Sequence, residues 1–224
     1  MKNKTTFLAN AILTLLSSTT LFGTTIFHTG LDWDRAMTIE LRADGHVRNA
    51  SAGVGVLLVD GAHYVDALCV NLFQAIYLNT TYTAQSIAPS AYDLDGGNPA
   101  AYLAENYLSS TLSAAGGAAL QLAVWDLIHD GGDGFASGRV QSSSNTAGNV
   151  LAQANAWRTE ALGQSGVASI FTAAPGTTAF QQQIYLTGNP DGGEVPEPGT
   201  LVTLAIGAVA VAFGSWRRRQ AAVR

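Results

Sequence analysis

Apolar segments near both ends limit where this chain of 224 residues can form a folded domain. Residues 200–216 contain no charged side chain, and Arg217, Arg218 and Arg219 follow directly. An apolar run of about 17 residues is close to the shortest that crosses a bilayer as a helix, and arginines behind it favour a cytoplasmic end. The sequence therefore predicts a transmembrane helix over 200–216 and a basic cytoplasmic tail over 217–224.

The N-terminal segment has the features of a secretory signal peptide. Lys2 and Lys4 precede an apolar stretch over 7–16, and the small residues at 23–25 offer a site for signal peptidase. We expect residues 1–25 to be removed, which leaves an ectodomain over 26–190 and a linker over 191–199. An ectodomain of this length is typical of a single domain.

The linker contains Pro196, Glu197 and Pro198 directly before the apolar run. The order of Pro-Glu-Pro, apolar segment and arginine cluster resembles the PEP-CTERM sorting signal of Gram-negative bacteria. The resemblance implies processing by an exosortase, a precursor anchored in the inner membrane by its C-terminal helix, and a mature form at the cell surface or in the extracellular matrix. An ordinary single-span anchor with a chance Pro-Glu-Pro is the alternative.

The portion between the two ends is acidic. Residues 26–194 contain five arginines, no lysine and 15 acidic side chains, a formal net charge of −10. Nucleic acid is excluded as an expected partner, because phosphate binding depends on lysine and arginine. Since both lysines lie in the predicted signal peptide, the ectodomain also presents no ε-amine to an electrophile on a neighbouring copy.

The pattern of the ectodomain predicts strands, then helices, then a strand. Two β-like runs, 54–59 and 62–73, flank Asp60 and Gly61, a pair that suits a tight hairpin turn. We expect a second strand pair and a last strand with exposed glutamines, over 74–78, 82–87 and 180–187. Helices are expected over 100–108, 114–129 and 145–162, the first capped by Asn98 with Pro99 at its first position. This order predicts an α+β fold with a sheet or barrel-like part, a small helical subdomain and the C-terminal transmembrane helix.

Cys69 is the only cysteine of the chain. A single cysteine in an exported protein indicates an intermolecular disulfide, a reactive thiol or a thiol already engaged in a covalent bond. A buried cysteine that packs as a small hydrophobic residue is the structural alternative.

Two motifs carry a second resemblance. Cys69 stands in Leu68-Cys69-Val70-Asn71, and Gln121 stands in Leu120-Gln121-Leu122-Ala123-Val124-Trp125. Together they resemble the Cys and Gln motifs of bacterial thioester domains over about residues 47–186. The resemblance implies that the Cys69 thiolate attacks the Gln121 carboxamide, that ammonia leaves, and that Ala123 and Trp125 pack around the bond. Leu68 replaces a frequent aromatic residue, and Leu120 replaces a frequent threonine.

The resemblance implies a surface protein that covalently captures amine or hydroxyl acceptors on a polysaccharide or a surface protein, in adhesion or matrix attachment. Such a protein would be consumed, so we do not expect an enzyme. The alternative is a non-covalent structural protein of the exopolysaccharide or biofilm matrix in which no thioester forms. Signal peptidase and exosortase are the expected processing partners, and no cofactor or metal is expected.

Physical chemistry favours the same residue types. A strand facing a helix can hold a thiolate near a carbonyl, and the positive end of the helix would stabilise an oxyanion on Gln121. Pairing of Cys69 with His63, His129 or His46 would instead suggest a hydrolase. Carboxylates near Asp93 and Asp95, and near Asp130 and Asp133, would suit calcium, although turn chemistry also explains them.

Overall fold

The computed structural model describes residues 23–92 and 96–186. The Pro-Glu-Pro linker, the predicted transmembrane helix, the basic tail and most of the predicted signal peptide lie outside these residues. Within the described part, no helix combines the length and the apolar character needed to cross a membrane.

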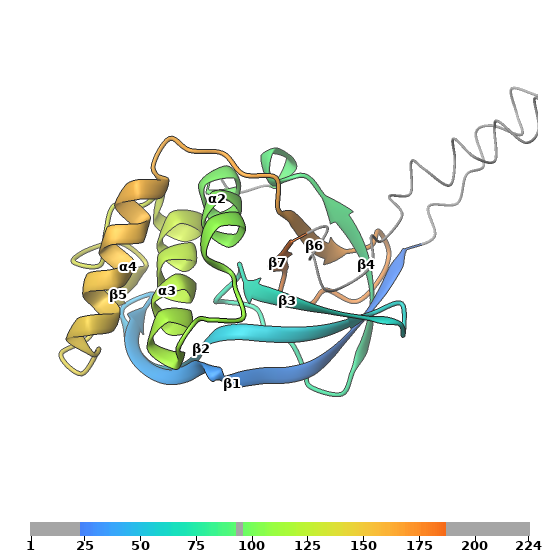
Figure 1. Ribbon diagram of the computed structural model, residues 1–224, viewed down its shortest axis with the longest axis horizontal. Coiled ribbons are helices and arrows are strands. Elements are labelled where there is room, and N and C mark those ends of the chain that lie inside the picture. The colour runs from blue at the N-terminus through green and yellow to red at the C-terminus, as the bar shows by residue number, and fades with distance from the viewer. Residues whose placement is uncertain (1–22, 93–95, 187–224) are drawn as a thin grey trace, which may run out of the picture.

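Seven strands of the described part form one antiparallel sheet (Figure 1). They are β1 (Thr24–Ala43), β2 (His46–Val59), β3 (His63–Cys69), β4 (Thr81–Ile87), β5 (Val140–Ser142), β6 (Ser169–Ala173) and β7 (Gln183–Tyr185). The pairings run in the order β2, β3, β7, β6, β4 and β1, and β1 pairs again with β2. Six strands therefore close into a ring, and β5 extends the sheet at the end of β1.

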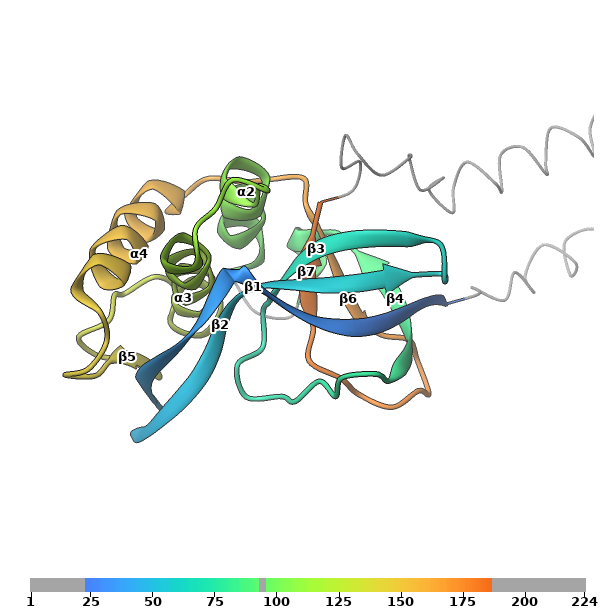
Figure 2. The ribbon, with the colours of Figure 1, turned by 60° about the horizontal axis from the view of Figure 1, so that its bottom comes forward.

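The long strand β1 joins the ring to the helices. Its first residues, 24–27, pair with β4, its last residues, 41–43, pair with β5, and β2 follows it with breaks in register. Figure 2 shows β1 and β2 leaving the ring together and bending toward α3. At the second break, between Leu31 and Ala36, the buried Arg35 forms ion pairs with Asp32 and Asp66.

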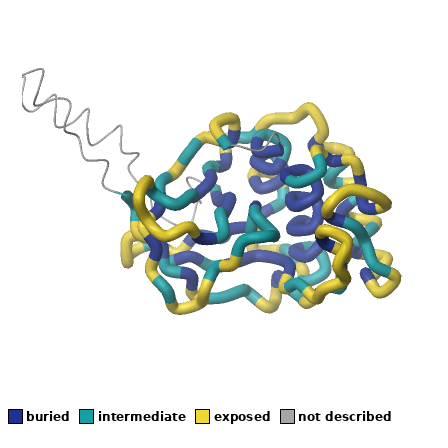
Figure 3. Tube along the Cα trace, turned by 180° about the vertical axis from the view of Figure 1, so that it is seen from behind, coloured by how far each residue is buried: buried dark blue, intermediate teal, exposed yellow. Residues whose placement is uncertain are grey.

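Three α-helices cover one end of this sheet: α2 (Gly97–Tyr107), α3 (Ala114–Asp130) and α4 (Gly148–Ala161). A short 3₁₀ turn, η1 (Pro89–Ala91), precedes them. Helix α3 packs against β1, β2, α2 and α4, and every residue from Gly117 to Ile128 is buried. A helix buried on all sides is a core element. Figure 3 shows this buried interior in dark blue.

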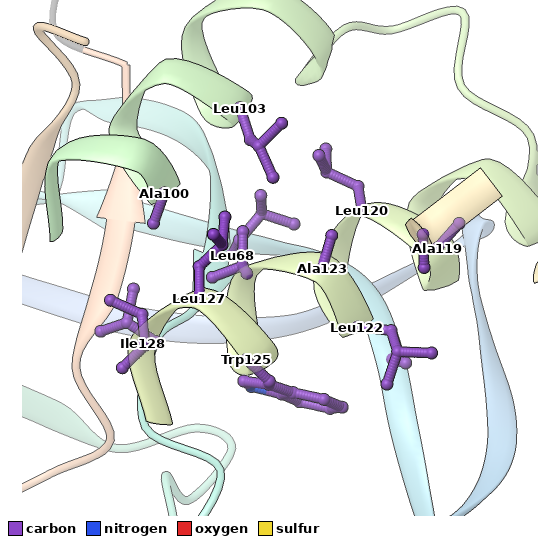
Figure 4. Close-up of a cluster of buried hydrophobic side chains, with 14 of the residues drawn as sticks. Leu68, Ala100, Leu103, Ala119, Leu120, Leu122, Ala123, Trp125, Leu127 and Ile128 are labelled. Carbon is purple, nitrogen blue, oxygen red and sulfur yellow. The ribbon is translucent and has the colours of Figure 1, made fainter. Parts of the chain in front are cut away.

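Two hydrophobic clusters stabilise the fold. One lies around α3 and includes Leu68, Leu103 and Leu120 (Figure 4), and the other lies inside the ring and includes Ile26 and Phe171. Of the β3 side chains, Val65 and Ala67 belong to the cluster inside the ring, whereas Leu68 belongs to the cluster around α3 and Cys69, at the end of the strand, packs against it. Strand β3 therefore passes between the ring interior and the helical layer.

The predicted α+β class and the Asp60-Gly61 hairpin are confirmed. Asp60 and Gly61 have φ values of 49° and 67°, the positive values that a tight hairpin turn requires. The predicted strand over 74–78 is wrong, because β4 pairs with β1 and β6 instead. Helix α2 begins at Gly97, so Asn98 and Pro99 lie inside its first turn, and Asn98 is not the N-cap.

The N-terminal boundary of the fold differs from the expected cleavage point. Strand β1 begins at Thr24, and the backbone N–H of Thr25 donates to the Asp60 carboxylate at 2.7 Å. The backbone N–H of Asp60 donates to the carbonyl oxygen of Thr25 at 2.8 Å. Cleavage after residue 25 would remove both hydrogen bonds, whereas cleavage before Gly23 would leave β1 intact.

Candidate functional site

Cys69 and Gln121, which are 52 residues apart in the chain, lie side by side. Cys69 is the last residue of β3, and Gln121 lies in the middle of α3. The Cys69 backbone N–H donates to Gln121 Oε1 at 2.9 Å, and Gln121 Nε2 donates to the Cys69 carbonyl oxygen at 2.6 Å. The structure thus brings together the two residues that the sequence motifs single out.

The Gln121 carboxamide occupies the position of a missing strand neighbour. Strand β3 pairs with β2 only as far as Ala67, while its other edge pairs with β7 through Cys69. The N–H and C=O of Cys69 on the β2 side would otherwise be unpaired. Because buried backbone groups need partners, the amide of Gln121, which is only 1% exposed, satisfies them and is satisfied in return.

Trp125 is the third member of the site. It follows Gln121 by four residues, which places both side chains on the same face of α3. Its indole Nε1–H donates to Cys69 Sγ at 3.4 Å, and the residue is 2% exposed. Burial raises the pKa of the Cys69 thiol to about 12, although the hydrogen bond from Trp125 and the backbone N–H of Asn71 act in the opposite direction. The thiol is therefore protonated at neutral pH.

Ala123, the other residue expected to pack around the bond, is buried on a different face of the helix. It follows Gln121 by two residues, a rotation of roughly 200° around the helix axis. Figure 4 shows Ala123 on the side of α3 that carries Leu120, with Trp125 on the opposite side. The observed contact with the cysteine side chain therefore comes from Trp125, while Ala123 belongs to the core around α3.

The expected role of the helix end is not supported by the geometry. Helix α3 begins at Ala114, so Gln121 lies beyond the first turn, where the effect of the helix dipole has fallen off. The group that faces the Gln121 carbonyl oxygen is the backbone N–H of Cys69.

A second set of amides lies around Cys69. Gln183 is its cross-strand partner and is 2% exposed, and Gln183 Nε2 donates to the Gln181 carbonyl oxygen at 3.3 Å. Gln181 Nε2 in turn donates to the Asn71 carbonyl oxygen at 3.1 Å. The expectation that these glutamines form an exposed row is wrong for Gln183. Their proximity to Cys69 could not be predicted from the sequence, because three consecutive glutamines fit a solvent-exposed strand as well as a buried one.

His129, one of the three histidines considered as partners of the cysteine, contacts other residues. His129 Nε2 accepts the backbone N–H of Leu72 at 3.3 Å, and its ring lies edge-on to Phe73. The hydrogen bonds that the described residues make to the Cys69 side chain involve no histidine. The thiol–imidazole arrangement of a cysteine hydrolase is therefore not formed by the described residues.

The carboxylates of Asp126, Asp130 and Asp133 approach one another, with one oxygen of each within 4.8 Å of the others. Asp130 accepts the backbone N–H groups of Arg139 and Val140, each at 2.8 Å. Asp126 accepts the N–H of Gly134 at 3.2 Å and faces Arg158 Nε at 3.7 Å. These contacts are those of side chains that stabilise a turn. The other candidate, Asp93 and Asp95, lies outside the described residues.

Two titratable groups near the end of α3, the buried Asp126 and the half-buried His129, are expected to give opposite pH dependences. Burial raises the pKa of Asp126 to about 7, so its contribution to stability is present below about pH 4 and is lost as pH rises toward 7. Burial lowers the pKa of His129 to about 4, so its contribution is present above about pH 6.5 and is lost as pH falls toward 4. In the wild type the two slopes largely cancel.

Asp126→Asn should therefore reveal the His129 slope. We expect the free energy of unfolding of this variant to rise by roughly 1–2 kcal/mol between pH 4.5 and 6.5. Urea denaturation at both pH values measures it, with His129→Gln as the matched variant that should show the opposite slope. Flat profiles in both variants would contradict the assignment.

Comparison with known proteins identifies one segment. A family model described as the PEP-CTERM protein-sorting motif matches residues 194–219, which include the Pro-Glu-Pro and the arginine cluster. The match supports an exosortase-sorted protein whose membrane-anchored precursor is exported and processed for surface display. Neither a curated protein nor a solved structure matches the chain. Because the matched segment contains neither Cys69 nor Gln121, the resemblance to thioester domains stays a prediction.

Proposed function

We propose that this exported protein covalently captures amine or hydroxyl acceptors at the cell surface through a thioester between Cys69 and Gln121. The observation that supports it best is the pair of hydrogen bonds, at 2.9 and 2.6 Å, that holds the Gln121 carboxamide against the Cys69 backbone. These hydrogen bonds join the strand that carries the cysteine to the helix that carries the amide, and holding two reacting groups on rigid elements is what raises effective molarity.

The two hydrogen bonds suit bond formation. Cys69 Sγ attacks Gln121 Cδ, and the negative charge that develops on Oε1 is stabilised by the Cys69 N–H. The C–N bond then breaks, and nitrogen leaves as ammonia with the proton of the thiol. The attack requires the sulfur to reach Cδ from a face of the amide, and the side chains of a strand project from the plane in which its backbone hydrogen bonds lie.

Capture uses the same carbon atom. An acceptor amine or hydroxyl attacks Gln121 Cδ, the C–S bond breaks, and Cys69 returns to a thiol while the acceptor remains on Gln121 as an amide or ester. Gln121 is almost fully buried whereas Cys69 is only partly buried, so water and acceptors alike reach the bond from the side of the cysteine. The reaction consumes the site, in keeping with attachment to a polysaccharide or a surface protein.

The absence of lysine from residues 26–194 fits this chemistry. A primary amine is a strong acceptor for a thioester, and neighbouring copies of the domain offer none on a side chain. Acceptors would then come from other molecules.

The intact mass of the purified exported protein tests the proposal. We expect a mass lower than the calculated mass by one ammonia, a gain of one methylamine when the protein is incubated with that amine, and the full mass in Cys69→Ala and Gln121→Ala. Gln183→Ala is the matched control, because Gln183 also lies beside Cys69 but should leave the mass deficit unchanged.

A full calculated mass with a free, alkylatable thiol would overturn the proposal. That result would favour the second candidate, a non-covalent structural protein of the extracellular matrix. The observation in favour of this candidate is that the pairing of Gln121 with the Cys69 backbone satisfies both partners without a covalent bond.

A further inference from the structure

The indole N–H of Trp125 points at a sulfur atom. Buried tryptophans usually direct this group to an oxygen acceptor, and a neutral thiol is only a weak acceptor. Trp125 is almost fully buried, and its donor lies 3.4 Å from Cys69 Sγ. The described hydrogen bonds of Trp125 Nε1 include no other partner. In the resting state, a strong hydrogen-bond donor is therefore paired with a weak acceptor.

We infer that the indole N–H of Trp125 stabilises negative charge on the sulfur of Cys69, and thereby sets how fast the site reacts. The chemical consequence rests on the proposed function: when an acceptor attacks Gln121 Cδ, the C–S bond breaks and its electron pair goes to Sγ. A hydrogen bond to an anion is stronger than one to a neutral atom. Trp125 therefore binds the departing sulfur more tightly than the sulfur of the intact thioester, which is the requirement for accelerating a reaction.

The position of Trp125 on α3 makes this role specific. Gln121 and Trp125 share one helix face, so a single rigid helix presents the acyl carbon and the donor for the leaving sulfur. No positively charged side chain contacts Sγ among the described hydrogen bonds and ion pairs. The neutral indole is thus the side-chain group that stabilises a thiolate on Cys69, whereas burial of the sulfur disfavours it.

The test uses Trp125→Phe, which keeps an aromatic ring and removes the N–H. The first measurement is the pH dependence of alkylation of the free thiol, made on protein opened with methylamine, or on protein as isolated if no thioester forms. Because the thiol pKa is already about 12, the comparison is made below the midpoint, where we expect Trp125→Phe to be alkylated about tenfold more slowly at a fixed pH. The second measurement is the rate of methylamine incorporation, which should fall by a similar factor.

Trp157→Phe is the control, because the Trp157 ring packs at a tilt against Tyr107, makes no described hydrogen bond to the cysteine, and its loss also removes one indole. Thermal unfolding of both variants separates a loss of fold from a change at the sulfur. A Trp125→Phe variant that melts like the wild type and shows an unchanged thiol titration would overturn the inference. If no thioester exists in the wild type, the proposed function fails, while the thiol titration still decides the role of Trp125.

Discussion

Gln121→Ala is expected to lower the free energy of unfolding by about 2–4 kcal/mol even where no thioester can form. The substitution leaves the N–H and the C=O of Cys69 without the partner that now sits at 2.9 and 2.6 Å. It also leaves a cavity beside a helix that is buried on all sides. Urea denaturation in a Cys69→Ala background measures this loss separately from any covalent bond.

The same substitution with Cys69 present measures the bond itself. A thioester would close a loop of the unfolded chain, as a disulfide does, and so add stability that Gln121→Ala also removes. We therefore expect a larger loss with Cys69 present than in its absence. Gln153→Ala, at an exposed position of α4, is the control and should change the stability little. If Gln121→Ala is as mild as this control in the Cys69→Ala background, the strand-like pairing does not stabilise the fold.

Gly117→Ala is expected to destabilise the domain by about 3 kcal/mol or to prevent folding, because α3 touches β1 at this residue. A Cβ atom on Gly117 would lie 1.8 Å from the Arg35 carbonyl oxygen, a backbone atom that cannot rotate away. Gly116→Ala is the matched control one residue earlier in the same helix. Its Cβ would meet the flexible Leu112 side chain at 3.1 Å, so it should be neutral or stabilise the helix by up to about 1 kcal/mol.

Gly117→Ala should also disturb the site. Relief of the clash moves α3 away from β1, and Gln121 lies one turn further along that helix. We expect protein that still folds to show incomplete loss of ammonia in its intact mass, whereas Gly116→Ala should match the wild type. Equal stability of the two alanine variants would show that the close approach of α3 to β1 is not a constraint.

Local signals predicted several elements correctly. Asp60 and Gly61 suit the positive φ values of a hairpin, and α3 ends at Asp130, one residue beyond the expected end, with the left-handed Gly131 as its C-cap. Cys69 was correctly placed on a strand and Gln121 on a helix. In each case residues close in sequence determine the conformation, so a local pattern was sufficient.

Other features depend on contacts between distant segments. The β-like pattern after Cys69 did not form the predicted second hairpin, because β4 finds its partners in β1 and β6. Strand β1 overlaps a segment whose composition suggested a cleavage site. Likewise, Gln183 is buried only because β7 pairs with β3 beside Cys69.

The sequence alone determined the sorting segment, the α+β class and the two residue types that a thioester requires, because composition, local turn chemistry and motif order carry that information. Only the tertiary structure decided that the Gln121 amide completes the open edge of β3 and that Trp125 donates to the sulfur. The physical reason is that the backbone N–H and C=O of Cys69 lack a strand partner only in the folded sheet, where β2 pairs with β3 no further than Ala67. Helix α3, which is distant in the sequence, then supplies the partner through Gln121.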